Sequence, residues 1–293
     1  MNTEQVLNVG SAGLLVRRFE SPGAPRLLLS HGNGFAIDGY RKFWELLQPD
    51  FELCMFDLRN HGRNACTPLA EHSLAAMARD HVDVQTAMSA AFGPRKTIGL
   101  FHSVSSIAAI RAAQEFALRW DALILFDPPL IAPSGNPLRD QNRKLDETLA
   151  GFARKRQHHF GATNELATQF RQRLGRSWVE GAEFDMASAV TRPATDGGFE
   201  LTCPGEYEAR IYADNAAYDS FDAMAALAQP TLLICADPNP PRAMPPAFSG
   251  PQAAQRFGFA HVSVPGTGHL LQIEKPKEAA AHARQFIAQI MQA

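Results

Sequence analysis

The feature that most constrains the fold is a series of short apolar segments spread along most of the chain. These segments are rich in Leu, Ile, Val and Phe, and polar residues do not alternate with apolar ones inside them. They cover residues 13–19, 26–30, 51–57, 96–101, 121–127, 231–236 and 261–264. Uninterrupted apolar runs of this length are typical of strands that are buried on both faces, as in a parallel sheet covered by helices.

Segments with helical spacing separate these predicted strands. We expect helices at 38–48, 73–92, about 104–117 and 275–291. Ser73 precedes the second of them and is a suitable N-cap residue, and the last is amphipathic. The alternation of strands and helices predicts an α/β fold with a mostly parallel, doubly wound sheet.

Residues 131–228 interrupt this alternation. They contain polar stretches with helical character, such as 140–157 and 163–174, but no convincing buried strand. Nearly a hundred residues between two sheet strands are too many for a loop in a compact domain. We therefore predict that residues 1–130 and 229–293 form one core, and that residues 131–228 are an inserted, mostly helical cap.

Composition narrows the expected partners and compartment. The formal net charge is −2 without a basic stripe, which argues against a nucleic-acid partner. The N-terminal residues do not resemble a signal peptide, and no apolar run approaches the roughly 18–20 residues of a membrane span. The four cysteines are scattered, as is typical of free thiols in a reducing compartment. We expect a cytoplasmic protein that acts on a small molecule, without a membrane partner.

Polar residues stand where the predicted strands end. Ligands of open α/β sheets bind at the carboxyl ends of the strands. The segment after 96–101 supplies His102 and Ser103, the segment 121–127 ends in Asp127, and 231–236 is followed by Asp237. The last strand leads into Gly-Thr-Gly and His269. Ser, Asp and His in this order match one known arrangement of a nucleophile, an acid and a base.

Four sequence motifs lie at the ends of these predicted strands. They are HGNGF at 31–35, FDLRNHGR at 56–63, IGLFHSVSSIAA at 98–109 and VPGTGHLLQIEKP at 264–276. Together they resemble the oxyanion loop, the FDLRGHG segment, the nucleophile elbow and the histidine loop of the α/β-hydrolase fold superfamily. The resemblance extends from about residue 26 to 275, with the cap as its variable part.

The resemblance implies a role for each site residue. Ser103 would attack an acyl carbon, and His269 would take its proton, because a serine hydroxyl is a weak nucleophile near neutral pH. A carboxylate would hold the tautomer of His269. The backbone N–H groups of Asn33 and Val104 would bind the oxyanion. This chemistry requires no metal and no organic cofactor.

The elbow departs from the usual G-x-S-x-G pattern at one position. Small residues are preferred two positions on either side of the nucleophile, where the turn is sharp. Ser105 satisfies this preference and Phe101 does not. The neighbouring serines have no better surroundings, so Ser103 remains the predicted nucleophile.

Two carboxylates are candidates for the acid. The position that usually carries it, a few residues after the penultimate strand, holds Asn239, and Asp237 lies two residues before it. Some haloalkane dehalogenases and cofactor-free dioxygenases of this fold carry the acid after the strand that precedes the cap. Asp127 has that position, so both Asp127 and Asp237 stay open.

Other polar residues have simpler interpretations. We expect His31 and His102 to be structural, and Asp57 to pair with Arg59 or Arg63. The pair at 158–159 is interpreted as part of a solvated helix face and not as a metal site.

The leading functional hypothesis is a serine hydrolase that cleaves an ester or lactone of a small apolar or aromatic substrate through an acyl-enzyme. Phe152, Phe160, Phe170 and Trp178 would suit an apolar or aromatic pocket, or the packing of the cap. One alternative is a cofactor-free oxygenase or lyase in which a His–Asp dyad deprotonates the substrate. Another is a binding module without catalytic activity.

Overall fold

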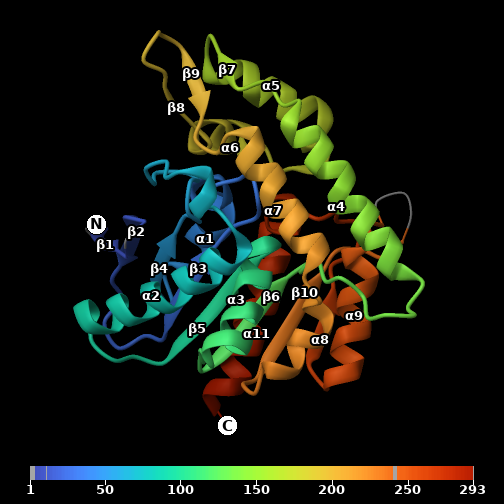
Figure 1. Ribbon diagram of the computed structural model, residues 1–293. Helices are drawn as coiled ribbons and strands as arrows, with labels where there is room; N and C mark the ends of the chain where they lie inside the picture. Colours follow the sequence, from blue (N-terminus) through green and yellow to red (C-terminus); the bar gives the residue numbers. More distant parts are fainter. Residues whose placement is uncertain (1–3, 11, 240–242, 293) are drawn as a thin grey trace.

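A computed structural model describes residues 4–10, 12–239 and 243–292 of the chain. Its centre is an eight-stranded sheet with the strand order β1-β2-β4-β3-β5-β6-β10-β11 (Figure 1). The strands are β1 (Glu4–Val9), β2 (Leu14–Phe19), β3 (Arg26–Ser30), β4 (Glu52–Phe56), β5 (Thr97–His102), β6 (Ala122–Phe126), β10 (Thr231–Cys235) and β11 (Ala260–Ser263). The β1–β2 and β2–β4 pairs are antiparallel and the other five pairs are parallel, so the prediction of a mostly parallel α/β sheet is confirmed.

Burial explains why the strands could be predicted. Every residue of β3, β4, β5, β6 and β10 is buried, as their mostly apolar sequences predict. Strand β1 was not predicted, because it pairs at the sheet edge with Val6 exposed and carries no continuous apolar run.

Helices cover both faces of the sheet. On one face α1 (Arg41–Leu47) and α11 (Pro276–Gln292) contribute to one apolar layer. On the other, α2 (Leu74–Phe92), α3 (Val104–Phe116) and α9 (Pro246–Phe257) contribute to a second layer. The Ser73 hydroxyl accepts a hydrogen bond from the Ala76 N–H, so Ser73 is the N-cap of α2 as its sequence position predicts.

The segment between β6 and β10 forms the upper and right-hand part of the molecule in Figure 1. Its helices are α4 (Leu138–Arg154), α5 (Thr163–Arg173), α6 (Ala182–Ala189), α7 (Gly205–Ala217) and α8 (Ser220–Ala223). Helices α4 and α7 pack along each other. Three short strands, β7 (His159–Phe160), β8 (Thr191–Pro193) and β9 (Phe199–Leu201), form a separate antiparallel sheet. Strands of this length leave no periodic signal in the sequence.

Short helical turns complete the fold. They are η1 (Ile37–Tyr40), η2 (Leu69–Glu71), η3 (Gly175–Ser177), η4 (Met224–Ala226) and the single-turn helix α10 (Leu271–Glu274). All four cysteines are free thiols. Within the described ranges, no helix has both the length and the apolar character needed to cross a membrane.

Candidate active site

Ser103 lies in the sharp turn between β5 and α3. Its backbone has φ 55° and ψ −123°, and positive φ is uncommon for a residue with a side chain. Hydrogen bonds of Ser103 and Ser105 stabilise the turn. The Ser103 N–H donates to the Phe126 carbonyl at 3.0 Å, and the Ser105 hydroxyl contacts the backbone N and O of His102 at 2.9 and 2.8 Å. The strained turn presents the Ser103 side chain to a cavity.

Phe101 is accommodated by the glycine two residues before it. Its ring is buried in the layer under α2 and α3, with ring centroids 4.8 Å from His81 and 5.6 Å from Trp120. A Cβ atom on Gly99 would lie 2.5 Å from the Phe101 ring. The small residue that makes room in this strand is therefore Gly99, which allows a large side chain at position 101.

Ser103, His269 and Asp127 form a continuous chain of hydrogen bonds. His269 Nε2 lies 2.9 Å from Ser103 Oγ, and His269 Nδ1 lies 2.7 Å from Asp127 Oδ2. The carboxylate is fully buried, and its other oxygen accepts from the Ala236 N–H at 2.9 Å. An ionised Asp127 can only accept, so Nδ1 of neutral His269 carries the proton and Nε2 is free to accept the Ser103 proton.

Asp237 has a different position from Asp127. Its Oδ1 accepts from the Asn239 backbone and side-chain amides at 2.9 and 2.7 Å, and its Oδ2 accepts from the Gly266 N–H at 2.6 Å. The Gly266 and Asn239 backbone N–H groups lower the pKa of Asp237. Of the two carboxylates that the sequence left open, Asp127 contacts His269, whereas Asp237 ties the end of β10 to the loop that carries His269.

His102 and Tyr40 connect two loops of the site, a link that the sequence did not reveal. His102 Nε2 lies 2.9 Å from the His269 carbonyl, which can only accept, so Nε2 carries the proton. His102 Nδ1 then accepts from the Tyr40 hydroxyl at 2.8 Å, and that hydroxyl accepts from the Gly32 N–H at 3.3 Å. Burial, and then the proximity of His269, lower the pKa of His102, so its ring is neutral in this relay. The expectation of a structural His102 agrees with these contacts.

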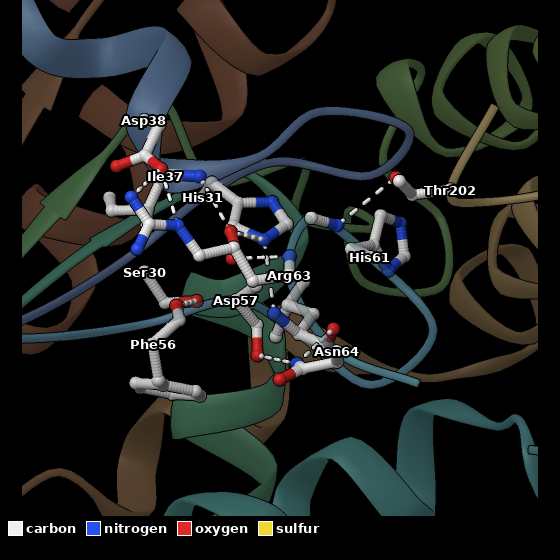
Figure 2. A network of polar contacts seen from close by, with 12 residues as sticks. Ser30, His31, Ile37, Asp38, Phe56, Asp57, His61, Arg63, Asn64 and Thr202 are labelled. Carbon is white, nitrogen blue, oxygen red and sulfur yellow. Dashed lines mark hydrogen bonds and ion pairs between the residues drawn. The ribbon is translucent and has the colours of Figure 1, made fainter. Parts of the chain in front are cut away.

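A second polar network lies beside the HGNGF loop (Figure 2). Asp57 accepts from the Ile37 N–H at 2.8 Å and from the Arg63 N–H at 3.1 Å. His31 Nε2 accepts from the Leu58 N–H at 3.0 Å and lies 3.3 Å from Asp57 Oδ1. The network ties the segment after β3 to the segment after β4, so both motifs contribute to one rigid support.

Of the two expected partners of Asp57, Arg63 contacts it and Arg59 does not. Arg63 contacts Asp57 through its backbone N–H. Arg59 instead forms an ion pair with Asp80, with Arg59 Nη2 2.6 Å from Asp80 Oδ1. That aspartate lies on α2, and a pairing between two separate elements cannot be read from sequence spacing alone.

Both predicted oxyanion residues line the cavity beside Ser103. Val104 is the first residue of α3, where a backbone N–H has no acceptor within its own helix. The side chain of Asn33 is turned away toward α7, because its amide donates to the Glu208 carbonyl at 2.8 Å. Its backbone N–H is thus the group of Asn33 that suits an oxyanion.

The cavity has a volume of about 710 Å³ and is bounded by both the sheet core and the inserted segment. Ser103, Val104 and His269 come from the core. Most of the remaining wall is apolar, and its larger members are Phe35, Leu145, Leu149, Phe152, Leu166, Phe170, Leu174, Ile211, Met244 and Leu270. Of the four aromatic residues expected at a pocket, Phe152 and Phe170 line it, and Phe160 and Trp178 pack in the core instead.

Charged and polar groups interrupt the apolar wall at two places. Lys155, Arg156 and Arg173 line the cavity, and Arg156 forms an ion pair with Glu208 at 2.9 Å. Elsewhere Asp146 of α4 accepts a hydrogen bond from Asn215 of α7 at 2.7 Å. Sequence reasoning missed the pair of Asp146 and Asn215, because the two residues meet only through the packing of α4 against α7.

The pair at 158–159 does not belong to a helix face, contrary to the sequence interpretation. Helix α4 ends at Arg154, and His159 lies on β7 opposite Glu200 of β9. His158, His159 and Glu200 offer ligand atoms within 4.8 Å of one another. Glu200, however, is engaged by Arg192, with the guanidinium Nε 2.7 Å from Glu200 Oε1. A cation at this distance opposes the binding of a metal ion by the same carboxylate.

Comparisons with known proteins identify the family. The model of the alpha/beta hydrolase family matches residues 27–283. The solved structure of E-2-(acetamidomethylene)succinate hydrolase superposes with a TM-score of 0.80 at 17% identity, covering 98% of this chain and 100% of that chain. The thioesterase domain from the curacin biosynthetic pathway gives a TM-score of 0.72 at 20% identity, with 96% and 98% covered.

A thermophilic esterase from Thermogutta terrifontis is a third structural relative, with a TM-score of 0.69, 18% identity and coverage of 98% and 99%. No curated protein matches the sequence of this chain. The match to the family model covers most of the chain, so this protein belongs to the alpha/beta hydrolase family. The resemblance seen in the four sequence motifs is thereby confirmed.

Proposed function

We propose that this protein is a serine hydrolase that cleaves an ester or lactone through an acyl-enzyme. The observation that carries the proposal is the hydrogen-bonded chain from Ser103 to His269 to Asp127 at the wall of a cavity. The two distances, 2.9 and 2.7 Å, are within the range for proton transfer and for holding the imidazole. In this proposal residues 131–228 act as a cap that closes the cavity.

Acylation begins when Ser103 Oγ attacks the acyl carbon and His269 Nε2 takes the hydroxyl proton. The carbonyl oxygen becomes negative, and the N–H groups of Asn33 and Val104 stabilise it. The bond to the leaving alkoxide then breaks, and the imidazolium returns its proton to that oxygen. Asp127 stabilises the imidazolium while it exists.

Deacylation repeats the sequence with water. His269 takes a proton from a water molecule, the hydroxide oxygen attacks the acyl carbon, and Ser103 leaves as its alkoxide and recovers the proton. The products are a carboxylic acid and the alcohol that left in the first step, or a hydroxy acid when the substrate is a lactone.

The shape of the cavity supports a small apolar or aromatic substrate. A volume of about 710 Å³ is within the range of small-molecule sites. Its apolar wall would desolvate a hydrocarbon or ring of the substrate, which favours binding in proportion to the buried area.

A second candidate reaction uses the same dyad without acylation. Asp127 follows β6, the strand before the inserted segment, which is the arrangement that the family resemblance links to cofactor-free dioxygenases as well as to dehalogenases. In such an oxygenase or lyase, His269 would remove a proton from the substrate itself and Ser103 would form no covalent bond.

Replacing Ser103 by Ala distinguishes the two reactions. Turnover of esters should fall by at least about a thousandfold if Ser103 is the nucleophile. Circular dichroism and thermal unfolding would check that the variant is folded. A folded Ser103→Ala protein that keeps most of its turnover would contradict the serine mechanism and favour the dyad reaction. A folded wild-type protein without turnover on any ester or lactone would favour a binding module.

A further inference from the structure

Asp146 and Asn215 form a polar patch in the otherwise apolar wall of the cavity. Asp146 is 4% exposed and Asn215 is 2% exposed, and both line the cavity together with Ser103 and His269. The Asn215 amide nitrogen donates to Asp146 Oδ2 at 2.7 Å and to the Pro129 carbonyl at 3.1 Å. These two contacts fix the orientation of the Asn215 amide, because the Pro129 carbonyl can only accept.

The patch contains an acceptor without a donor. Both hydrogens of the Asn215 amide are used, and its Oδ1 is buried with no hydrogen-bond partner among the described residues. Buried side-chain oxygens are normally paired, and a buried acceptor without a donor is unfavourable. A substrate group that donates a hydrogen bond to Asn215 Oδ1 would therefore gain affinity at this place.

Asp146 adds a carboxyl group that can both donate and accept hydrogen bonds. Burial raises the pKa of Asp146 to about 7, although the contact with Asn215 and the proximity of His269 oppose the shift. Near neutral pH the carboxyl is present in both forms, so it can donate a hydrogen bond when protonated and accept one when ionised.

Charged side chains elsewhere in the cavity disfavour a cationic ligand. Lys155, Arg156 and Arg173 all line the same cavity, and Glu208 is the acidic partner of Arg156. A protonated amine would meet a net excess of positive side chains on its way to Asp146. A neutral hydroxyl would not, and it can donate to Asn215 while accepting from a protonated Asp146.

We propose that Asp146 and Asn215 form a subsite that binds a hydroxyl group of the substrate. The inference rests on the proposed esterase function and names its substrate class, an ester or lactone whose hydrocarbon part carries a hydroxyl group. The apolar wall holds the hydrocarbon, and the subsite determines which hydroxylated chain length fits.

The test uses p-nitrophenyl esters of ω-hydroxyalkanoic acids of increasing length. Each is compared with the ester that carries a methyl group in place of the hydroxyl. For the chain length that reaches the subsite, wild-type kcat/KM should favour the hydroxyl ester by at least about tenfold. Equal rates, or faster reaction of the methyl ester at every length, would overturn the proposal. So would a preference for the ω-ammonium ester over the hydroxyl ester.

Substitutions show whether Asp146 and Asn215 cause the preference for the hydroxyl ester. Asp146→Leu and Asn215→Leu should each bring the ratio of kcat/KM for the hydroxyl ester to that for the methyl ester close to one. Glu147→Leu is the matched control, since Glu147 is an exposed acid on α4 that does not line the cavity, and it should keep the preference. An unchanged preference in both cavity variants would also overturn the proposal. The wild-type comparison stands even where a variant fails to fold.

Binding separates this inference from the proposed reaction. Calorimetric titration of Ser103→Ala with ω-hydroxyalkanamides and their methyl counterparts measures the subsite without any turnover. Tighter binding of the hydroxyl compound supports the subsite even if Ser103 proves not to be acylated. Equal binding contradicts the subsite even if Ser103 is the nucleophile.

Discussion

Asp146 makes the stability of this protein depend on pH in an unusual direction. Its pKa is about 7 in the folded chain against an ordinary value of 3.8, because the carboxyl is buried in the cavity wall. About three pH units at about 1.4 kcal/mol each correspond to about 4 kcal/mol. Because the pKa of Asp146 is raised, its protonated form contributes this amount to the free energy of unfolding below about pH 4. The contribution is lost as the pH rises toward 7.

Replacing Asp146 by Asn removes this dependence. The amide cannot ionise, and its oxygen can still accept the hydrogen bond from Asn215. Near pH 4 the variant and the wild type should have similar free energies of unfolding. Near pH 8 the variant should be more stable, by up to about 4 kcal/mol. Urea unfolding followed by circular dichroism at intervals between pH 4 and 8 measures the difference directly.

Asp237→Asn is the matched control with the opposite sign. Backbone N–H groups lower the pKa of Asp237, so its contribution to stability is present above the ordinary pKa and is lost as pH falls. This variant should be less stable than the wild type near pH 8. If Asp146→Asn and the wild type instead have the same stability at every pH, Asp146 is not held in a desolvated state and the reasoning is wrong.

Other predictions follow from the geometry of the site. Asp127→Asn should reduce kcat by about ten-thousandfold, whereas Asp237→Asn should change it only a few-fold; the reverse order would contradict the assignment of the acid. Gly99→Ala should destabilise the fold by about 1–3 kcal/mol in thermal unfolding, and adding Phe101→Leu should recover part of the loss; no rescue would contradict the packing argument. His102→Leu should lower kcat with little change in KM, and His102→Gln, which can still donate to the histidine loop, should retain more activity; equal losses would refute the relay.

Much of the fold was predictable because the apolar sequences of its central strands indicate burial on both faces. The centres of β3, β5 and β6 are short, uninterrupted apolar runs, and every residue of these strands is buried. The positions of Ser103 and His269 at one edge of the sheet were predictable because Ser103 follows β5 at once and His269 lies in the loop after β11. Strand β1 and the small sheet of the inserted segment were missed, since neither has a buried apolar run.

The choice between the two acids could not be made from the sequence. It depends on the backbone of Asp127, which turns with φ 41° at the end of β6, and on the distance to a histidine 142 residues away. Asp237 is equally close to a strand end, but the N–H groups of its own loop and of Gly266 occupy its oxygens. Local sequence contains neither of these facts.

The turn that carries Ser103 also depends on a contact that a local sequence rule does not include. A rule that inspects only the residues two positions from Ser103 flags Phe101 as too large. In the structure the ring fits because Gly99 leaves space beside it. The pairing of Asp146 with Asn215 is likewise a tertiary contact, between residues 69 positions apart on two packed helices.

Covalent labelling shows whether Ser103 is an activated nucleophile. The folded protein would be treated with a fluorophosphonate, which reacts with activated serines, and the labelled peptide would be identified by mass spectrometry. We expect one label on Ser103, greatly reduced in His269→Ala and absent in Ser103→Ala. A folded protein that carries no label on Ser103 while it still turns over its ester would show that Ser103 is not the nucleophile.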